Sequence, residues 1–230
     1  MYPSTRWHIF ANAASVAEEA ARRALAASSK AISELGKFRI ALAGGSTPLL
    51  TYRLLSRAAT DWSRWHIYFG DERCLPPDDP ERNSEAAARA WLDLVPIPAE
   101  NIHPIPAERG AEAAAEAYAP RIEAALPFDL VILGMGEDGH TASLFPGQAH
   151  PAAELTHAVH NAPKPPPDRV SLSAHALSQA RQILILVTGT GKSDAVSAWK
   201  AGAPLPVATI GEGAVVDVLI DREANPAKSD

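Results

Sequence analysis

Short apolar runs alternate along the chain with longer stretches that are rich in alanine and charged residues. The apolar runs have the length of buried strands, and the stretches between them have the length of helices. We predict strands at residues 38–43, 66–69, 129–133, 182–187 and 215–220, and helices at residues 13–34, 48–58, 84–94, 111–125 and 191–201. Strands that are apolar throughout and separated by helices are typical of a parallel sheet covered on both faces. The pattern therefore predicts a doubly wound, Rossmann-like α/β fold with a mostly parallel sheet.

A proline-rich segment at residues 162–167 interrupts this alternation. We expect it to be an extended surface loop, because proline removes backbone donors and restrains its neighbours. A further strand, predicted at residues 169–173, is expected to continue the same sheet. With 230 residues and 47% hydrophobic content, the chain can bury one large core. We therefore expect a single domain over residues 1–230.

The amino-acid composition restricts the kinds of partner and the compartment that we expect. The formal net charge is −6 and no stripe of lysine and arginine is visible, which argues against a nucleic-acid partner. No apolar run approaches the roughly 18 residues of a membrane helix, and charges at residues 18–23 interrupt the N-terminal alanines, so neither a membrane span nor a secretory signal is expected. The single cysteine, Cys74, cannot form an internal disulfide, which fits a reducing compartment. We expect a cytoplasmic protein that is a monomer or a small homo-oligomer.

Open α/β sheets bind ligands beyond the carboxyl ends of their strands, and four predicted strand ends carry unusual residues. The first reads Gly44-Gly45-Ser46-Thr47-Pro48. Paired glycines let the backbone approach a ligand closely, Thr47 can cap the following helix, and proline suits the first helical turn. Backbone N–H groups and the positive helix end then favour a phosphate, although a tight turn without a ligand would have the same sequence.

The second strand end carries Asp71, Glu72 and Arg73. Arg73 offers planar donors for an oxyanion, and the alternative is a surface cluster of ion pairs.

The third strand end is a glycine-rich loop that brings Asp138, Gly139 and His140 together. An imidazole with a pKa near 6.5 can act as a general base at neutral pH, and glycine amides such as that of Gly139 can face a substrate. Asp71 and Asp138 are both candidates to orient His140.

The fourth end combines Arg169 with Lys192, which follows Gly189 and Gly191 at the start of a predicted helix. The spacing is not that of a nucleotide-binding P-loop, because Leu186 stands five positions before Gly191. Arg169 and Lys192 are instead suited to neutralising one phosphate monoester.

Together, these segments resemble the 6-phosphogluconolactonase branch of the glucosamine-6-phosphate isomerase/6-phosphogluconolactonase family, over about residues 43–192. The resemblance rests on ordered motifs, which are Gly-Gly-Ser-Thr-Pro, Asp-Glu-Arg, Gly-x-Gly-x-Asp-Gly-His-Thr-Ala-Ser-Leu-Phe-Pro, Arg-x-Ser-Leu-Ser and Gly-x-x-Lys. It implies hydrolysis of 6-phospho-D-glucono-1,5-lactone to 6-phosphogluconate in the oxidative pentose phosphate pathway, with neither metal nor cofactor.

The resemblance also implies roles for individual residues. The 6-phosphate would be held by Gly45, Ser46, Thr47, Arg169 and Lys192. The lactone would lie among Asp71, Arg73 and His140, with His140 as the base, and Arg73 or amides of loop 136–139 would stabilise the oxyanion. Where the family often carries Ser-Asn after the Asp-Glu-Arg motif, this chain reads Arg82-Asn83-Ser84, so no contact from Asn83 is predicted.

Three other interpretations compete with this one. An aminosugar-phosphate isomerase/deaminase would share the phosphate site, but that branch carries tyrosine in place of Arg73 and Asn-Glu-Pro in place of residues 144–146. A sugar-phosphate sensor without turnover usually carries a DNA-binding module, and no helix-turn-helix extension is evident. Cys74 could be a nucleophile activated by His140, although an incidental small residue is favoured. His157 and His160 lack a third ligand at metal spacing, so we expect them on the surface and predict no metal site.

Overall fold

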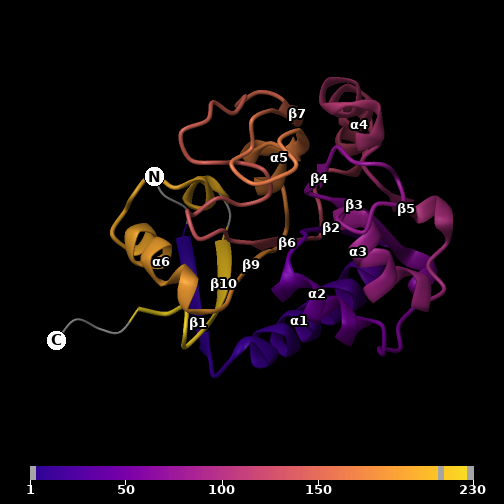
Figure 1. The fold of residues 1–230 in the computed structure, drawn as a ribbon. Coiled ribbons are helices and arrows are strands. Elements are labelled where there is room, and N and C mark those ends of the chain that lie inside the picture. The colour runs from indigo at the N-terminus through magenta and orange to yellow at the C-terminus, as the bar shows by residue number, and fades with distance from the viewer. Residues whose placement is uncertain (1–3, 212–214, 227–230) are drawn as a thin grey trace.

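The computed structural model describes residues 4–211 and 215–226, and a seven-stranded sheet lies at its centre (Figure 1). The strands run parallel in the order β1-β10-β9-β6-β2-β3-β5. Their bounds are β1 Ser4–Phe10, β2 Phe38–Leu42, β3 Trp65–Phe69, β5 Ile102–His103, β6 Leu130–Gly134, β9 Ile183–Val187 and β10 Val215–Asp221. All five strands predicted to form the framework lie in this sheet, which confirms the predicted fold class.

Six α-helices accompany the strands in the described part of the chain. They are α1 Ala13–Leu35, α2 Ser46–Leu55, α3 Asn83–Ala90, α4 Ala111–Ala125, α5 Ala174–Ser178 and α6 Ser193–Lys200. Helix α1 begins where the Asn12 side chain accepts a hydrogen bond from the Ser15 amide, and it ends at Gly36, whose φ of 74° suits glycine. Helix α1 contacts α2 and the strands β2, β9 and β10, so these two helices cover one face of the sheet (Figure 1).

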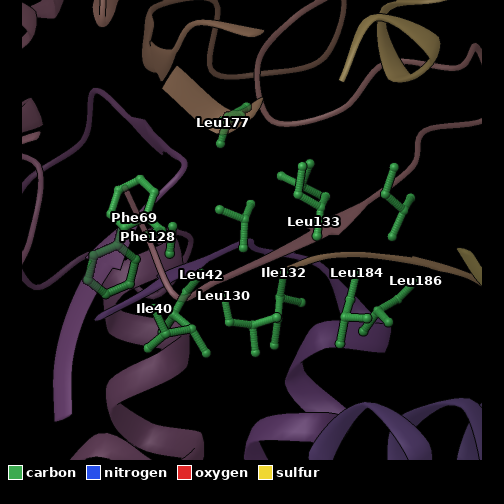
Figure 2. Packing of buried hydrophobic residues seen from close by; sticks show 14 of the residues in the cluster. Ile40, Leu42, Phe69, Phe128, Leu130, Ile132, Leu133, Leu177, Leu184 and Leu186 are labelled. Atoms are coloured by element: carbon green, nitrogen blue, oxygen red, sulfur yellow. The ribbon is translucent and has the colours of Figure 1, made fainter. Parts of the chain in front are cut away.

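Both faces of the sheet are buried. In Figure 2, Ile132 and Leu184 point toward the helices on one side of the strands, whereas Leu133 lies on the other side, toward Leu177 of α5. Successive side chains of a strand point to opposite faces, so a strand buried on both faces must be apolar at every position. This explains why β6 and β9, in the middle of the sheet, are continuous apolar runs rather than alternating ones.

A second sheet corrects the prediction for residues 169–173. The strands β4 (Asp71–Arg73), β8 (Arg169–Leu172) and β7 (Thr156–Val159) form a separate antiparallel sheet in the order β4-β8-β7. The chain leaves the parallel sheet at Gly70, whose carbonyl oxygen accepts a hydrogen bond from the Leu172 amide. A hydrophobic run identifies a strand but not its partner, and the prediction that this strand continues the main sheet was wrong.

Other local differences are small. The helix predicted at 84–94 ends as an α-helix at Ala90 and continues as a 3-10 turn at Leu92–Leu94. The helix predicted at 191–201 begins as a 3-10 turn at Thr190–Lys192 before α6. Within residues 4–211 and 215–226, no helix is long and apolar enough to cross a membrane.

Candidate active site

One cleft lies beyond the carboxyl ends of β9, β6, β2 and β3, four strands that are neighbours in the sheet. It has a volume of about 420 Å³. Among the predicted site residues, the cleft is lined by Gly44, Gly45, Ser46, Thr47, Asp71, Arg73, His140, Arg169 and Lys192. Asp138 and Gly139 are not among the residues that line it. All four unusual strand ends of the sequence therefore meet at one place.

The turn after β2 forms one wall of the cleft. Gly45 has φ 101° and ψ 163°, a conformation that side chains rarely adopt, and α2 begins directly after it. The buried hydroxyl of Tyr52 donates to the Ala43 carbonyl oxygen at 2.8 Å and accepts from the Ala43 amide, which holds the turn in place. Helix α2 has no acidic residue in its first turn, and the amides of that turn have no acceptor within the helix. This wall is suited to an anion.

Two arginines face each other across the second sheet. Arg73 of β4 is the register partner of Arg169 of β8, and both side chains line the cleft. Like charges directly opposite each other are unfavourable in a sheet, and an anion between them removes this cost. Burial, which is the largest cause, lowers the pKa of Arg169, as does the nearby Arg73 charge, while Asp71 counteracts it. The pair is a second feature that is suited to an anion.

Two lysines complete the cationic part of the cleft. Lys192 lines it from the 3-10 turn after β9, and burial lowers the pKa of its ammonium group. Lys164 lines it from the proline-rich loop. The buried Arg169 guanidinium donates to the carbonyl oxygens of Lys164 at 3.0 Å and Pro165 at 3.2 Å, and so anchors that loop. The sequence analysis predicted only a surface loop here and did not predict a role for Lys164. The signal that could have identified it is a lysine between prolines, because the prolines restrain the backbone that carries the charge.

His140 is held by its neighbour. Its Nδ1 lies 2.5 Å from Asp138 Oδ1, and its backbone amide donates to the same oxygen. Burial raises the pKa of Asp138, but the hydrogen bonds from His140 outweigh this and lower it below the ordinary value. An ionised carboxylate only accepts, so Nδ1 carries the proton and Nε2 keeps a lone pair for a base. Asp138, and not Asp71, is the hydrogen-bond partner of His140.

Asp71 is buried at the base of the cleft. Its Oδ2 accepts from the Ser143 hydroxyl at 2.7 Å, and its Oδ1 accepts from Asn83 Nδ2 at 3.1 Å. Asn83 also lines the cleft, although the sequence did not predict a contact for it. The sequence did not indicate this contact, because the residues beside Asn83, Arg82 and Ser84, differ from the Ser-Asn motif that the family often carries.

Several other expectations change. The amide of Gly136 donates to the His140 carbonyl oxygen and the amide of Gly139 donates to Gly136, so these two loop amides are engaged within the turn. Cys74 is half-buried and does not line the cleft, and burial raises the pKa of its thiol to about 11, which disfavours a nucleophilic thiolate. His157 is buried rather than on the surface, because β7 turns it toward His150. His160 is exposed as expected.

No group of three or more histidine, cysteine, aspartate or glutamate residues in the described ranges has the geometry to hold a metal ion.

Residues 11–219 match the model of the family described as glucosamine-6-phosphate isomerases/6-phosphogluconolactonase. The 6-phosphogluconolactonase of Mycobacterium tuberculosis is 38% identical, with 96% of this chain and 97% of that protein covered. Two solved 6-phosphogluconolactonase structures are also similar. That of Thermotoga maritima has a TM-score of 0.87 at 28% identity, covering 94% of this chain and 100% of that one. That of Trypanosoma brucei has a TM-score of 0.84 at 29% identity, covering 97% and 98%.

Proposed function

Because the chain belongs to the glucosamine-6-phosphate isomerase/6-phosphogluconolactonase family, we propose that it hydrolyses 6-phospho-D-glucono-1,5-lactone to 6-phosphogluconate. This is a step of the oxidative pentose phosphate pathway, and we propose that the chain performs it without metal or cofactor. The protein would be a single cytoplasmic domain, monomeric or a small homo-oligomer, with no nucleic-acid or membrane partner. For a single domain we expect one unfolding transition. For a monomer or a small homo-oligomer we expect a mass by light scattering that equals one chain or a small whole number of chains.

The observation that carries the proposal is the composition of one cleft. A histidine held by a carboxylate shares it with the cations Arg73, Arg169, Lys164 and Lys192 and with the start of α2. Cations and helix amides bind a phosphate, and the imidazole can act as a base on water. A phosphorylated ester is the kind of substrate that needs both parts.

In the proposed mechanism, His140 Nε2 removes a proton from a water molecule as the water oxygen attacks the lactone carbonyl carbon. Asp138 stabilises the imidazolium that forms. The tetrahedral intermediate then collapses, the bond from the carbonyl carbon to the ring oxygen breaks, and His140 returns the proton to that oxygen. The steps are general base and then general acid catalysis, with no covalent intermediate.

Arg73 is the proposed donor to the oxyanion. Its Nη1 donates to the Glu81 carbonyl oxygen at 2.6 Å, while its buried Nε has no hydrogen-bond partner among the described residues. The amides of Gly136 and Gly139 are already engaged, so Arg73 is preferred over them. A donor to a developing oxyanion typically lowers the barrier by about 3 to 4 kcal/mol.

The test is decay of 6-phosphogluconolactone with wild type and His140→Ala, corrected for spontaneous hydrolysis. We expect a loss on the order of 10²-fold to 10⁴-fold, as for removal of a general base. His175→Ala is the matched control, because His175 is exposed and lies outside the cleft. Activity of His140→Ala near that of the control would remove His140 from the mechanism. Release of ammonia from glucosamine 6-phosphate by the wild type would instead assign the deaminase reaction.

A further inference from the structure

Asn83 is fixed in the cleft by its main chain. It is the first residue of α3, and its amide donates to Glu72 Oε1 at 2.7 Å, while the amide of Ser84 donates to Glu72 Oε2 at 2.9 Å. Glu72 is fully buried on β4. The start of α3 is therefore tied to the strand that carries Asp71 and Arg73.

The Asn83 side chain has a determined orientation. Its Nδ2 lies 3.0 Å from the Asp71 carbonyl oxygen and 3.1 Å from Asp71 Oδ1. Both atoms only accept hydrogen bonds, so the nitrogen and not the oxygen of the Asn83 amide must face them. The carbonyl oxygen Oδ1 is then directed to the opposite side, toward the turn after β2.

Gly44 locates that oxygen in the cleft. A Cβ built on Gly44 would lie only 2.0 Å from Asn83 Oδ1, so the amide oxygen occupies the place of a side chain at this turn. Both residues line the cleft. No donor in the described parts of the chain forms a hydrogen bond with Oδ1. It is an acceptor between the proposed phosphate site at Gly45 and the proposed lactone site at Asp71.

We propose that Asn83 Oδ1 accepts a hydrogen bond from a ring hydroxyl of the substrate and thereby determines specificity for the sugar. The inference rests on the proposed function, which places a phosphate and a carbonyl carbon at the two ends of the same molecule. The hydroxyl-bearing ring carbons lie between those ends. The four cationic side chains of the cleft only donate hydrogen bonds, and both carboxylate oxygens of Asp71 already accept from Asn83 and Ser143. Asn83 Oδ1 is therefore an available acceptor for a hydroxyl hydrogen.

The experiment combines removal of a substrate hydroxyl with removal of the Asn83 side chain. The kcat/KM of wild type and Asn83→Ala is measured with the 6-phosphorylated lactone and with its 2-deoxy, 3-deoxy and 4-deoxy analogues. In the wild type, the analogue lacking the partner hydroxyl should lose about 10-fold to 100-fold, because Oδ1 is left unpaired. In Asn83→Ala, the same analogue should lose no more than about 3-fold relative to the full substrate, since the acceptor is already gone.

A general defect would not produce this pattern. Glu85→Ala, in the same helix but outside the cleft, is the matched control and should discriminate among the analogues as wild type does. Asn83→Asp keeps an oxygen at the position of Oδ1 but places its other oxygen against the two Asp71 acceptors, so it should retain the discrimination at a lower overall rate. If Asn83→Ala does not fold, Asn83→Ser replaces it, because serine is too short to reach the hydroxyl.

Two results overturn different statements. Equal losses in wild type and in the variant that lacks the acceptor, for all three analogues, would refute the role of Asn83 while leaving hydrolysis intact. A wild type that does not accelerate lactone decay would refute the proposed function. In that case calorimetric binding of 6-phosphogluconate and its deoxy analogues to the same variants tests the hydroxyl contact separately, and absence of coupling there would refute it.

Discussion

Replacing Gly136 by alanine would place a methyl group where the imidazole of His140 lies. A Cβ built on Gly136 would be 2.0 Å from His140 Nδ1, 2.2 Å from Cε1 and 2.6 Å from Asp138 Oδ1. Ordinary contact begins at about 3.4 Å. The imidazole must therefore retreat by at least ~1.4 Å, or the turn at residues 136–140 must open. Glycine is needed here because of this close approach, and not because of an unusual φ.

The size of the effect follows from that displacement. A shift of about 1 Å at a reacting group can cost on the order of 10²-fold in rate. We therefore expect Gly136→Ala to lower kcat/KM by about 10²-fold or more, equivalent to ~2.7 kcal/mol of transition-state stabilisation. The side chain of His140 is 20% exposed, so the ring can move outward. The free energy of unfolding should change by no more than about 1 kcal/mol.

The assay is lactone decay over a range of substrate concentrations, with urea unfolding of the same protein samples. Gly134→Ala is the matched control, because it lies in the same segment and the nearest atom to its added Cβ is the Gly44 carbonyl oxygen at 3.9 Å, an ordinary contact. It should keep activity within about 3-fold of wild type. If Gly136→Ala were as active as Gly134→Ala, the position of the imidazole would not matter for the rate. The geometric reasoning would then fail.

Three further predictions concern stability and binding. Glu72→Gln should lower the free energy of unfolding, measured in urea, by about 3 kcal/mol, because the side-chain NH₂ of glutamine would replace the buried oxygen that accepts from the Ser84 amide. Glu85→Gln, next to Ser84 in α3, is the control and should change it by no more than ~0.5 kcal/mol. Burial, together with His150, lowers the pKa of His157 to about 4 from 6.5, so the unfolded chain takes up the proton first as the pH falls. The contribution of His157 to the free energy of unfolding should therefore be complete above pH 6.5 and should fall by about 2 kcal/mol by pH 4.5. His157→Gln should make the free energy of unfolding depend less on pH over this range, whereas His175→Gln should leave that dependence unchanged. Lys192→Ala and Lys164→Ala should each raise the KM for the lactone by about 10-fold with a smaller effect on kcat, and a loss confined to kcat would contradict a phosphate-binding role.

Five central strands of the parallel sheet could be predicted because burial on both faces makes most of their residues apolar. Residues 183–187 are apolar at each position and lie as β9 in the middle of the sheet. The edge strand β5 has only two residues and leaves no such signal, and the edge strand β1 begins with three polar residues, among them the charged Arg6. These strands were not predicted because their pairing is decided by distant contacts, such as those of β1 with β10.

The site was predictable to the extent that its residues follow strands. Gly45, Asp71 and His140 each come soon after a buried run, so their meeting follows from the parallel arrangement alone. Lys164 and Asn83 follow no strand of that sheet. Their places depend on Arg169, which anchors the proline-rich loop, and on Glu72, which anchors α3. Such contacts between side chains far apart in the chain cannot be predicted from the residue pattern of a single sequence.

The second sheet gives the cleft its two arginines, and its register determines whether they face it. Arg73 pairs with Arg169, and Asp71 pairs with Ser171 two positions away, so the charged side chains lie on one face. A slip by one residue would turn a whole strand to its other face and remove an arginine from the cleft. The hydroxyl of Ser171 accepts from the Ser143 amide, and the hydroxyl of Ser143 donates to Asp71, which links both strands to the histidine loop. The same contacts that fix the register therefore also fix the distance between the cations and the proposed base.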